Sequence, residues 1–178
     1  SLGYCDEDVS SAVKLQVDKG VTFSLATELE QKLARKLIEH IPSAEMIRFG
    51  KNGTDATSGA IRIARAITGK DHVLVCGYHG WQDWYIAATS RNKGIPKSVA
   101  NLTHAVAYND LDAVEKMLNN HKGEFAVLIM EPMNVTFPKQ GYLEQLHNLL
   151  KKHGTLLIFD EVVTGFRFDI AGAQSLFN

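Results

Sequence analysis

The sequence has few cysteines, no long apolar run and almost no net charge, and each of these absences narrows its function. Cys5 and Cys76 are its two cysteines. They form neither a disulfide framework nor a metal-binding pattern, which favours the reducing cytoplasm and predicts no metal site. No apolar run approaches the ~20 residues that cross a bilayer. The formal net charge of −1 gives no indication of binding to nucleic acid or to an anionic membrane.

The chain has 178 residues, of which 45% are hydrophobic and 22% charged, as in an ordinary globular protein. A chain of this length buries roughly 70% of its unfolded surface, so it can form a substantial core. It begins with Ser1 and not with Met, and no signal peptide is visible. We therefore expect a chain that begins inside a longer protein.

Two helices are expected near the start of the chain. Residues 6–19 carry apolar side chains at helical spacing, and Gly20 follows as a C-terminal stop. Thr27 and Glu30 then have the spacing of a capping box. The following apolar residues recur every four positions until Pro42, which predicts a long amphipathic helix. The domain organisation expected is a helical segment over residues 1–45 and an α/β domain over residues 46–178.

Strand-like and helix-like segments alternate from residue 46 onward. The expected strands are residues 46–49, 73–76, 103–107, 125–130 and 156–159. The expected helices between them are residues 56–67, 111–118 and 142–150. This alternation predicts an α/β fold with a mainly parallel sheet and flanking helices.

Chemically distinctive residues follow the first two of these strands. Asn52, Gly53 and Thr54 stand in a glycine loop that opens a helix, an arrangement that presents backbone N–H groups and a helix dipole to an anion. The loop matches neither a P-loop nor a dinucleotide Gly-x-Gly-x-x-Gly. The second loop, residues 77–85, holds four aromatic residues and His79. It forms either a hydrophobic lid over the core or a flat platform for a planar ring.

Acidic residues follow two further strands. Glu131 comes directly after residues 125–130, and Asp160 follows the apolar run 156–159. Asp160 either caps the next turn or faces a ligand. If the strands are parallel, all four loops meet at the carboxyl edge of one sheet, where open α/β sheets bind ligands. The ligand they indicate has an anionic end, a flat ring and a basic ring nitrogen, and pyridoxal 5′-phosphate (PLP) has all three.

Residues 160–167 read Asp-Glu-Val-Val-Thr-Gly-Phe-Arg. This run resembles the central motif of class III (subgroup II) PLP-dependent aminotransferases, most closely their glutamate-1-semialdehyde 2,1-aminomutase branch. The other motifs match in order over almost the whole chain. The resemblance implies PLP-dependent transferase fold type I, with residues 46–178 forming part of the large PLP-binding domain.

The resemblance also implies roles for individual residues. It pairs Asp160 with the pyridine nitrogen of the cofactor and packs Tyr78 and Val162 on opposite faces of the ring. His79 matches the motif without a defined role, and Glu161 and Arg167 are expected to be structural. The cofactor-binding residues that it implies are Asn52, Gly53, Thr54, Tyr78, His79, Glu131, Asn134, Asp160 and Val162.

The family's catalytic lysine, which forms a Schiff base with PLP, has no counterpart here. The chain ends 18 residues after Asp160, and that tail contains no lysine. The resemblance therefore implies part of an enzyme that transfers amino groups between small-molecule donors and acceptors and forms a homodimer when complete. The loops after Trp81 and Glu131 favour a substrate other than glutamate semialdehyde, such as an amino sugar. The alternatives are a non-catalytic relative of this fold and a nucleotide-binding α/β domain that uses the Gly53 loop.

Overall fold

The computed structural model describes residues 2–133 and 135–177, so the predicted site residue Asn134 lies outside the described residues. The chain divides into two compact units, one up to Arg48 and one from Phe49 onward.

The first unit consists of two helices, α1 (Glu7–Lys19) and α2 (Glu28–His40). The capping box is present as predicted, because the Thr27 hydroxyl accepts from the Glu30 backbone and the Glu30 carboxylate accepts from the Thr27 backbone. Gly20 ends α1 with φ of 101°, a conformation that glycine adopts without strain. Neither helix contains a buried residue, so burial within this unit contributes little to its stability.

The second unit contains a four-stranded sheet in the order β2-β1-β3-β4, and every strand pair is parallel. Its strands are β1 (His72–Cys76), β2 (Thr103–Ala105), β3 (Phe125–Met130) and β4 (Leu156–Phe159). Its helices are α3 (Gly53–Thr68), α4 (Asp83–Ile86), α5 (Lys97–Ala100), α6 (Leu111–Asn120), α7 (Tyr142–Lys152) and the 3₁₀ helix η1 (Ala173–Phe177). The predicted α/β class and parallel sheet are confirmed.

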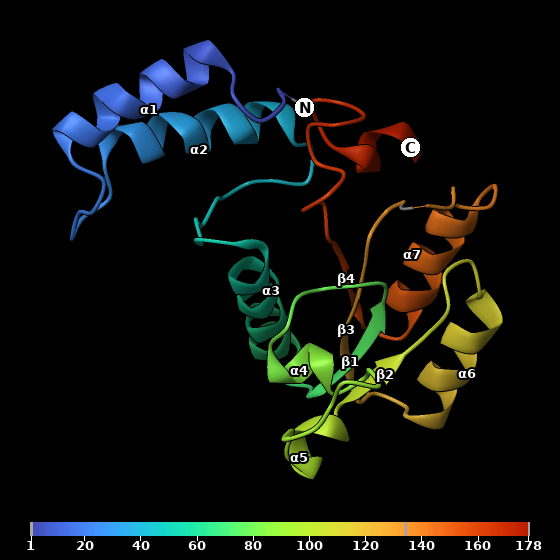
Figure 1. Ribbon diagram of the computed structural model, residues 1–178. Helices are drawn as coiled ribbons and strands as arrows, with labels where there is room; N and C mark the ends of the chain where they lie inside the picture. Colours follow the sequence, from blue (N-terminus) through green and yellow to red (C-terminus); the bar gives the residue numbers. More distant parts are fainter. Residues whose placement is uncertain (1, 134, 178) are drawn as a thin grey trace. The chain divides into compact units, whose positions relative to one another are not determined.

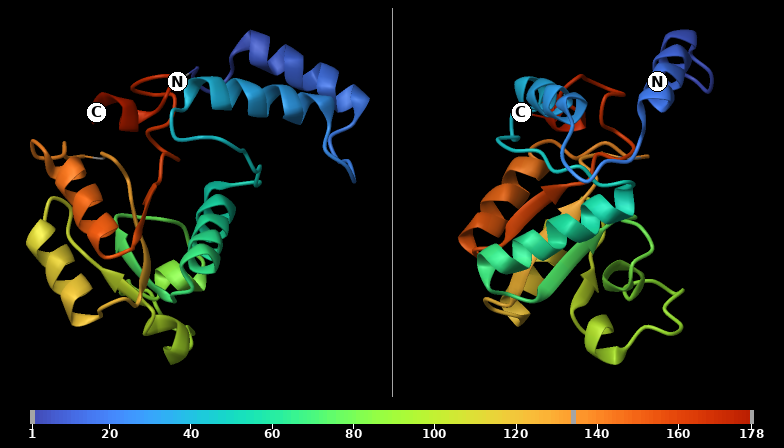
Figure 2. Two further views of the ribbon diagram at one scale, coloured as in Figure 1. Left: turned by 180° about the vertical axis from the view of Figure 1, so that it is seen from behind. Right: turned by 90° about the vertical axis from the view of Figure 1, so that its left-hand side faces the viewer.

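Helices cover both faces of this sheet, with α3 on one side and α6 and α7 on the other (Figures 1 and 2). Alternate strand residues point to opposite faces. Val73, Val75 and Ile129 therefore pack in one cluster with α3, whereas Leu74 and Leu128 pack in another with α6 and α7. All six residues of β3 are buried because this strand is covered on both faces and paired on both edges.

The predicted strand at residues 46–49 is wrong, because this segment has no regular secondary structure. A strand is stable only where a neighbouring strand takes up its backbone hydrogen bonds. The segment spans the boundary between the two units, and the side chain of Met46 is 87% exposed. The apolar residues of this segment are therefore not evidence of a strand. Among the described residues, no strand precedes α3.

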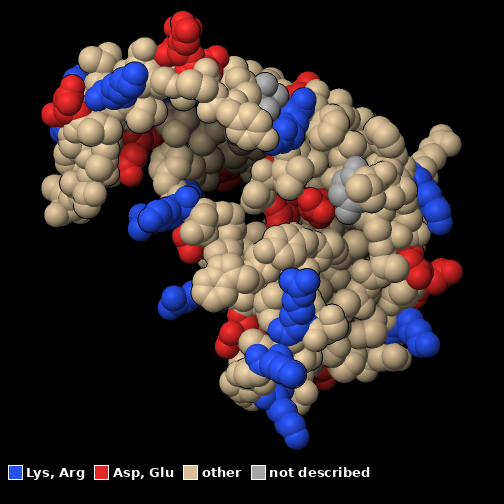
Figure 3. Space-filling view, in the orientation of Figure 1, with Lys and Arg blue, Asp and Glu red and all other residues tan. Residues whose placement is uncertain are grey.

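Charged side chains of both signs lie on the face of the second unit drawn in Figure 3. Lys and Arg gather toward the bottom, where Figure 1 places α5, and Asp and Glu are spread more widely. Among the described residues, no helix is long and apolar enough to cross a membrane.

Gly59 lies in α3 on an exposed stretch of helix, and a Cβ atom added there meets no atom within 4 Å. Alanine costs less backbone entropy than glycine in a helix. We therefore expect Gly59→Ala to raise the free energy of unfolding by about 0.5–1 kcal/mol. Denaturant titration of both proteins measures the difference, and a destabilised variant would contradict the described environment of this helix face.

Cys76 and Cys5 should differ in reactivity. Burial, followed by the nearby charge of Glu131, raises the pKa of the Cys76 thiol to about 11, so only about 0.1% is thiolate at pH 8. Cys5 is exposed. Iodoacetamide at pH 8 should therefore alkylate Cys5 in the native protein and Cys76 only after denaturation. Peptide mapping by mass spectrometry measures both sites, and equal native labelling would refute the burial of Cys76.

Candidate active site

Asp160 lies at the carboxyl end of β4, where its backbone N–H donates to the carbonyl of Met130 on β3 at 2.8 Å. Its carboxylate is buried, with 5% of the side chain exposed. The Oδ1 atom accepts a hydrogen bond from the backbone N–H of Val162 at 3.0 Å. Asp160 therefore caps the turn that follows it, and it also lines a pocket.

His79 is the second partner of the Asp160 carboxylate. Its Nδ1 atom lies 2.8 Å from Oδ2 of Asp160, and its Nε2 atom lies 3.1 Å from the carbonyl oxygen of Cys76. The side chain of His79 is fully buried. The bond to Asp160 joins the loop after β1 to the end of β4, and the two bonds together fix the orientation of the imidazole ring.

The partners of His79 determine where its protons lie. A carbonyl oxygen can only accept, so Nε2 carries a proton and donates it to Cys76. One further proton then lies between Nδ1 and the Asp160 carboxylate. When the imidazole holds this proton, the pair is a charge-assisted hydrogen bond between an imidazolium and a carboxylate. In that form the imidazolium lies next to the negative charge of the buried carboxylate.

The aromatic loop after β1 divides into a buried part and an exposed part. Trp84 and Tyr85 belong to the core, where the Trp84 indole N–H donates to Ser58 and the Tyr85 hydroxyl donates to the carbonyl of Gly77. Burial raises the pKa of Tyr85. Tyr78 and Trp81 are about two-thirds exposed and line the pocket. The loop therefore has a part that belongs to the core and an exposed aromatic part, and its use as a platform for a planar ring stays a prediction.

The amino end of α3 lies against this loop. Thr57, one turn into the helix, donates its hydroxyl proton to the carbonyl of His79 at 3.0 Å. The backbone N–H of Trp81 donates to the Thr54 hydroxyl at 3.3 Å. Gly80 has φ of 105°, and a Cβ atom there would lie 2.8 Å from the Cβ of Thr54. Glycine is therefore needed at this position for the loop to approach the helix so closely.

Gly53 forms a similar close contact on the other side of the helix end. A Cβ atom on Gly53 would lie 2.9 Å from Cγ2 of Val162. Asn52 precedes it as the N-cap, and its side chain accepts from the backbone N–H of Asp55 at 3.1 Å. The absence of a side chain on Gly53 thus allows Val162 to lie next to the first turn of α3.

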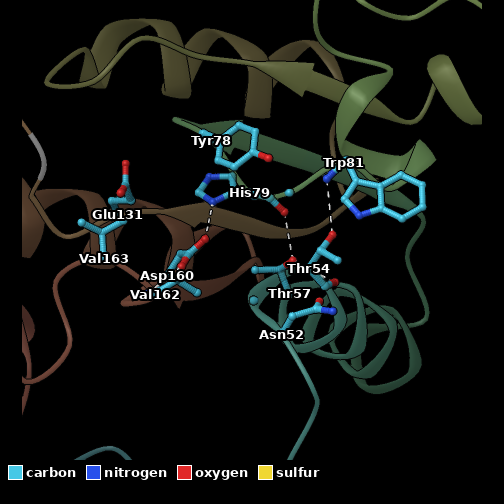
Figure 4. A pocket seen from close by; sticks show the side chains of 12 residues that line it. Asn52, Thr54, Thr57, Tyr78, His79, Trp81, Glu131, Asp160, Val162 and Val163 are labelled. Atoms are coloured by element: carbon cyan, nitrogen blue, oxygen red, sulfur yellow. Dashed lines mark hydrogen bonds and ion pairs between the residues drawn. The ribbon is translucent and has the colours of Figure 1, made fainter. Parts of the chain in front are cut away.

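These elements enclose a pocket of about 330 Å³ (Figure 4). The structure brings together at this pocket the predicted residues Asn52, Gly53, Thr54, Tyr78, His79, Glu131, Asp160 and Val162. Figure 4 shows Tyr78 and Val162 on opposite sides of the His79–Asp160 hydrogen bond.

Sequence reasoning missed four lining residues, Thr57, Gly80, Trp81 and Val163. Thr57 lies one helical turn after Gly53, a spacing that places both on the same face of α3, so this position could have been found. Gly80 and Trp81 belong to the loop already singled out, and Val163 to the run of residues 160–167. Their positions depend on how two loops fold back on the sheet edge, which no local pattern specifies.

Glu161 points to a different set of partners from Asp160. Its carboxylate accepts from the backbone N–H groups of Ala173 and Gln174 at 2.8 and 2.9 Å. It also accepts from the hydroxyl of Thr164. Glu161 thus fixes the position of the segment that follows residues 160–167. It does not line the pocket.

Comparison with known proteins identifies this architecture. Residues 1–172 match the model of the family "Aminotransferase class-III". The chain is 40% identical to a glutamate-1-semialdehyde 2,1-aminomutase from Methanococcus maripaludis, covering 99% of this chain and 45% of the relative. It is 41% identical to an enzyme of the same name from Citrifermentans bemidjiense, with the same coverage. The chain therefore spans about half the length of the curated relatives it matches.

Solved structures agree with this comparison. An omega-transaminase from Sphaerobacter thermophilus superposes with a TM-score of 0.88 at 30% identity, covering 98% of this chain and 44% of that one. A glutamate-1-semialdehyde aminomutase from Pseudomonas aeruginosa superposes with a TM-score of 0.82 at 26% identity, covering 98% and 41%. The transferase fold implied by the sequence is confirmed, and the chain belongs to the class III aminotransferase family.

Proposed function

We propose that the protein to which this chain contributes transfers amino groups with PLP, and that the pocket at the carboxyl edge of the sheet holds this cofactor. The observation that carries the proposal is the buried Asp160 carboxylate, which is held in the pocket by His79 and the backbone N–H of Val162. A buried carboxylate with this support is suited to pair with a protonated ring nitrogen.

The amino end of α3 fits the phosphate of the cofactor. The first N–H groups of a helix have no partners within the helix, and the helix dipole adds partial positive charge there. In α3, which has 16 residues, these groups belong to Gly53 and Thr54 at the pocket wall. The side chain of Asn52 and the hydroxyl of Thr54 add polar groups beside them.

The walls of the pocket fit a planar ring. Tyr78 supplies an aromatic surface, and its ring is held edge-to-face against Tyr85 at 5.5 Å. Val162 supplies the opposite wall with a stiff, β-branched side chain. Glu131 lines the same pocket. A role for Asn134 near the phenolic oxygen stays a prediction.

Asp160 carries the main electrostatic contribution in this proposal. Its negative charge favours the protonated form of a ring nitrogen beside it, because opposite charges stabilise each other at short range in a buried site. The bound cofactor then supplies an electron sink for the substrate. His79 keeps the carboxylate oriented and, by sharing one proton with it, influences how much negative charge Asp160 presents to the pocket.

The remaining parts of the proposal concern the complete protein. We propose a cytoplasmic homodimer that acts on a small-molecule amino donor and acceptor, with a catalytic lysine outside this chain. Exposed apolar residues on α1 and α2, such as Val13 and Leu29, are consistent with a subunit contact. The relatives are named for an aminomutase, and the preference for another substrate stays a prediction. A nucleotide-binding role is less favoured because it would leave the His79–Asp160 pair without a ligand.

Replacing Asp160 by Asn tests the role of its charge. In the full-length protein, Asp160→Asn should retain PLP and lower kcat about 10- to 100-fold. The lost charge-assisted hydrogen bond is worth about 1.5–3 kcal/mol, and asparagine cannot hold a ring nitrogen in the protonated state. Steady-state amino transfer and the absorbance of bound PLP measure the two effects.

The matched control for this variant is Asp112→Asn, on an exposed position in the first turn of α6. It removes the same charge far from the pocket and should leave kcat unchanged. Turnover near that of the wild type in Asp160→Asn, with PLP bound, would refute the assignment of Asp160.

Replacing Gly53 by Ala tests the phosphate end of the pocket. The added Cβ atom must displace Val162, which it would meet at 2.9 Å. We expect PLP to bind about 3- to 10-fold more weakly, which corresponds to roughly 0.7–1.4 kcal/mol. Fluorescence titration of the apo full-length protein with PLP gives the dissociation constants.

Gly59→Ala serves as the control, because it makes the same substitution in α3 where the space is open. It should leave the affinity for PLP unchanged. Equal affinities in the wild type and both variants would place the phosphate site elsewhere.

A further inference from the structure

A cluster of three histidines and one glutamate lies at the end of the sheet opposite the pocket. His72 is the first residue of β1, and Glu124 directly precedes β3. His121 is the C-cap of α6, and His104 lies on β2. The four residues thus connect three strands and a helix at the amino end of β1 and β3. They do not line the pocket, and they do not belong to the family motif.

The backbone holds three of these residues in place. The N–H of His72 donates to the carbonyl of Glu124, and the N–H of Glu124 donates to the carbonyl of His121, both at 3.1 Å. The pairing of β1 with β3 is irregular between His72 and Val73, where β3 contains one extra residue. Such a bulge turns side chains away from the direction that regular pairing would give them.

The side chains converge on one point. The Nδ1 atom of His121 lies 3.1 Å from Oε2 of Glu124, and Nε2 of His72 lies 3.5 Å from the same oxygen. One ligand atom from each of the three residues lies within 4.8 Å of the others. A tetrahedral zinc ion with bonds of about 2.0–2.1 Å separates its ligand atoms by roughly 3.3 Å. Two of the three separations therefore already have the required size.

His104 is the partner of the other ring nitrogen of His72. The Nδ1 atom of His72 lies 2.8 Å from Nε2 of His104. When Nδ1 of His72 donates to His104, the lone pair of Nε2 is available to a metal ion beside Glu124. A hydrogen bond from the second ring nitrogen is the usual support of a metal-binding histidine.

Phe125 packs against all three imidazole rings from one side. Its ring is edge-to-face with those of His72, His104 and His121, at centroid distances of 5.7, 5.3 and 5.6 Å. Because Phe125 is buried, the rings rest on a fixed apolar wall. The Glu124 side chain is 52% exposed, so the cluster stays open to solvent and to an incoming ion.

We propose that this cluster binds a divalent transition-metal ion of the zinc type through His72 Nε2, His121 Nδ1 and the Glu124 carboxylate. Water from the open side completes the coordination. Two imidazole nitrogens and one carboxylate suit Zn²⁺ and Co²⁺, whereas Ca²⁺ and Mg²⁺ prefer sites made of oxygen. The ion joins β1 to the turn between α6 and β3. The sequence did not reveal this site because His72 is far along the chain from His121 and Glu124, and a histidine and a glutamate three residues apart are no metal motif by themselves.

The test is metal titration of the full-length protein without a histidine tag. Competition of Zn²⁺ against a chromophoric chelator should show one site per chain, and Co²⁺ should give the visible absorption of a tetrahedral complex. The double variant His121→Gln/Glu124→Gln should lose this site. His104→Gln should weaken Zn²⁺ binding by about 10- to 100-fold, as for other residues that orient a metal ligand.

The matched control is Glu144→Gln/His147→Gln, a glutamate and a histidine three residues apart on the exposed side of α7. It should leave Zn²⁺ binding unchanged. In the wild type, Zn²⁺ should also protect His72 and His121 from diethyl pyrocarbonate, as mapped by mass spectrometry, a measurement that does not depend on a folded variant. The proposal would be overturned by a Zn²⁺ stoichiometry well below one per chain, by an equal loss of Zn²⁺ binding in the control variant, or by no protection of the two histidines from the reagent. Each of these results would mean that surface histidines take up metal adventitiously.

Discussion

Parallel pairing of β1, β3 and β4 is the constraint on which the candidate site depends. Parallel strands all end at the same edge of a sheet, so the loops that follow them meet there. Met130 pairs with Phe159, and Cys76 pairs with Met130. The residues that follow these three positions therefore start from one line at the sheet edge. Short hydrogen bonds, such as that from Asp160 N–H to Met130, then suffice to fix the pocket floor.

The His79–Asp160 bond places a supported carboxylate at this sheet edge. A buried aspartate without partners would take up a proton to avoid the cost of desolvation. With His79 on one oxygen and the Val162 N–H on the other, the carboxylate stays oriented and can keep its charge. The bond also connects two loops that are 81 residues apart. It thus serves the stability of the loops and the electrostatics of the pocket at once.

The sequence predicted the strands and the strand-end acids well because each depends on local pattern. Asp160 and Glu131 follow apolar runs, and apolar runs between helices become strands when partners exist. The segment at residues 46–49 shows the limit, since three of its four residues are apolar but no strand of the described residues pairs with it. The partners of His79 were not predicted for a related reason. A histidine in a loop carries no signal of which strand end it will contact.

Polar clusters lie at both ends of β1. The strand interior is apolar and packed on both faces, so the length of the strand separates the histidine cluster from the pocket. The irregular pairing beside His72 leaves the amino end of β1 less regularly bonded than its carboxyl end. A cation bound by the histidine cluster would add a connection where the strand pairing is irregular. It would leave unchanged the register that pairs Cys76 with Met130.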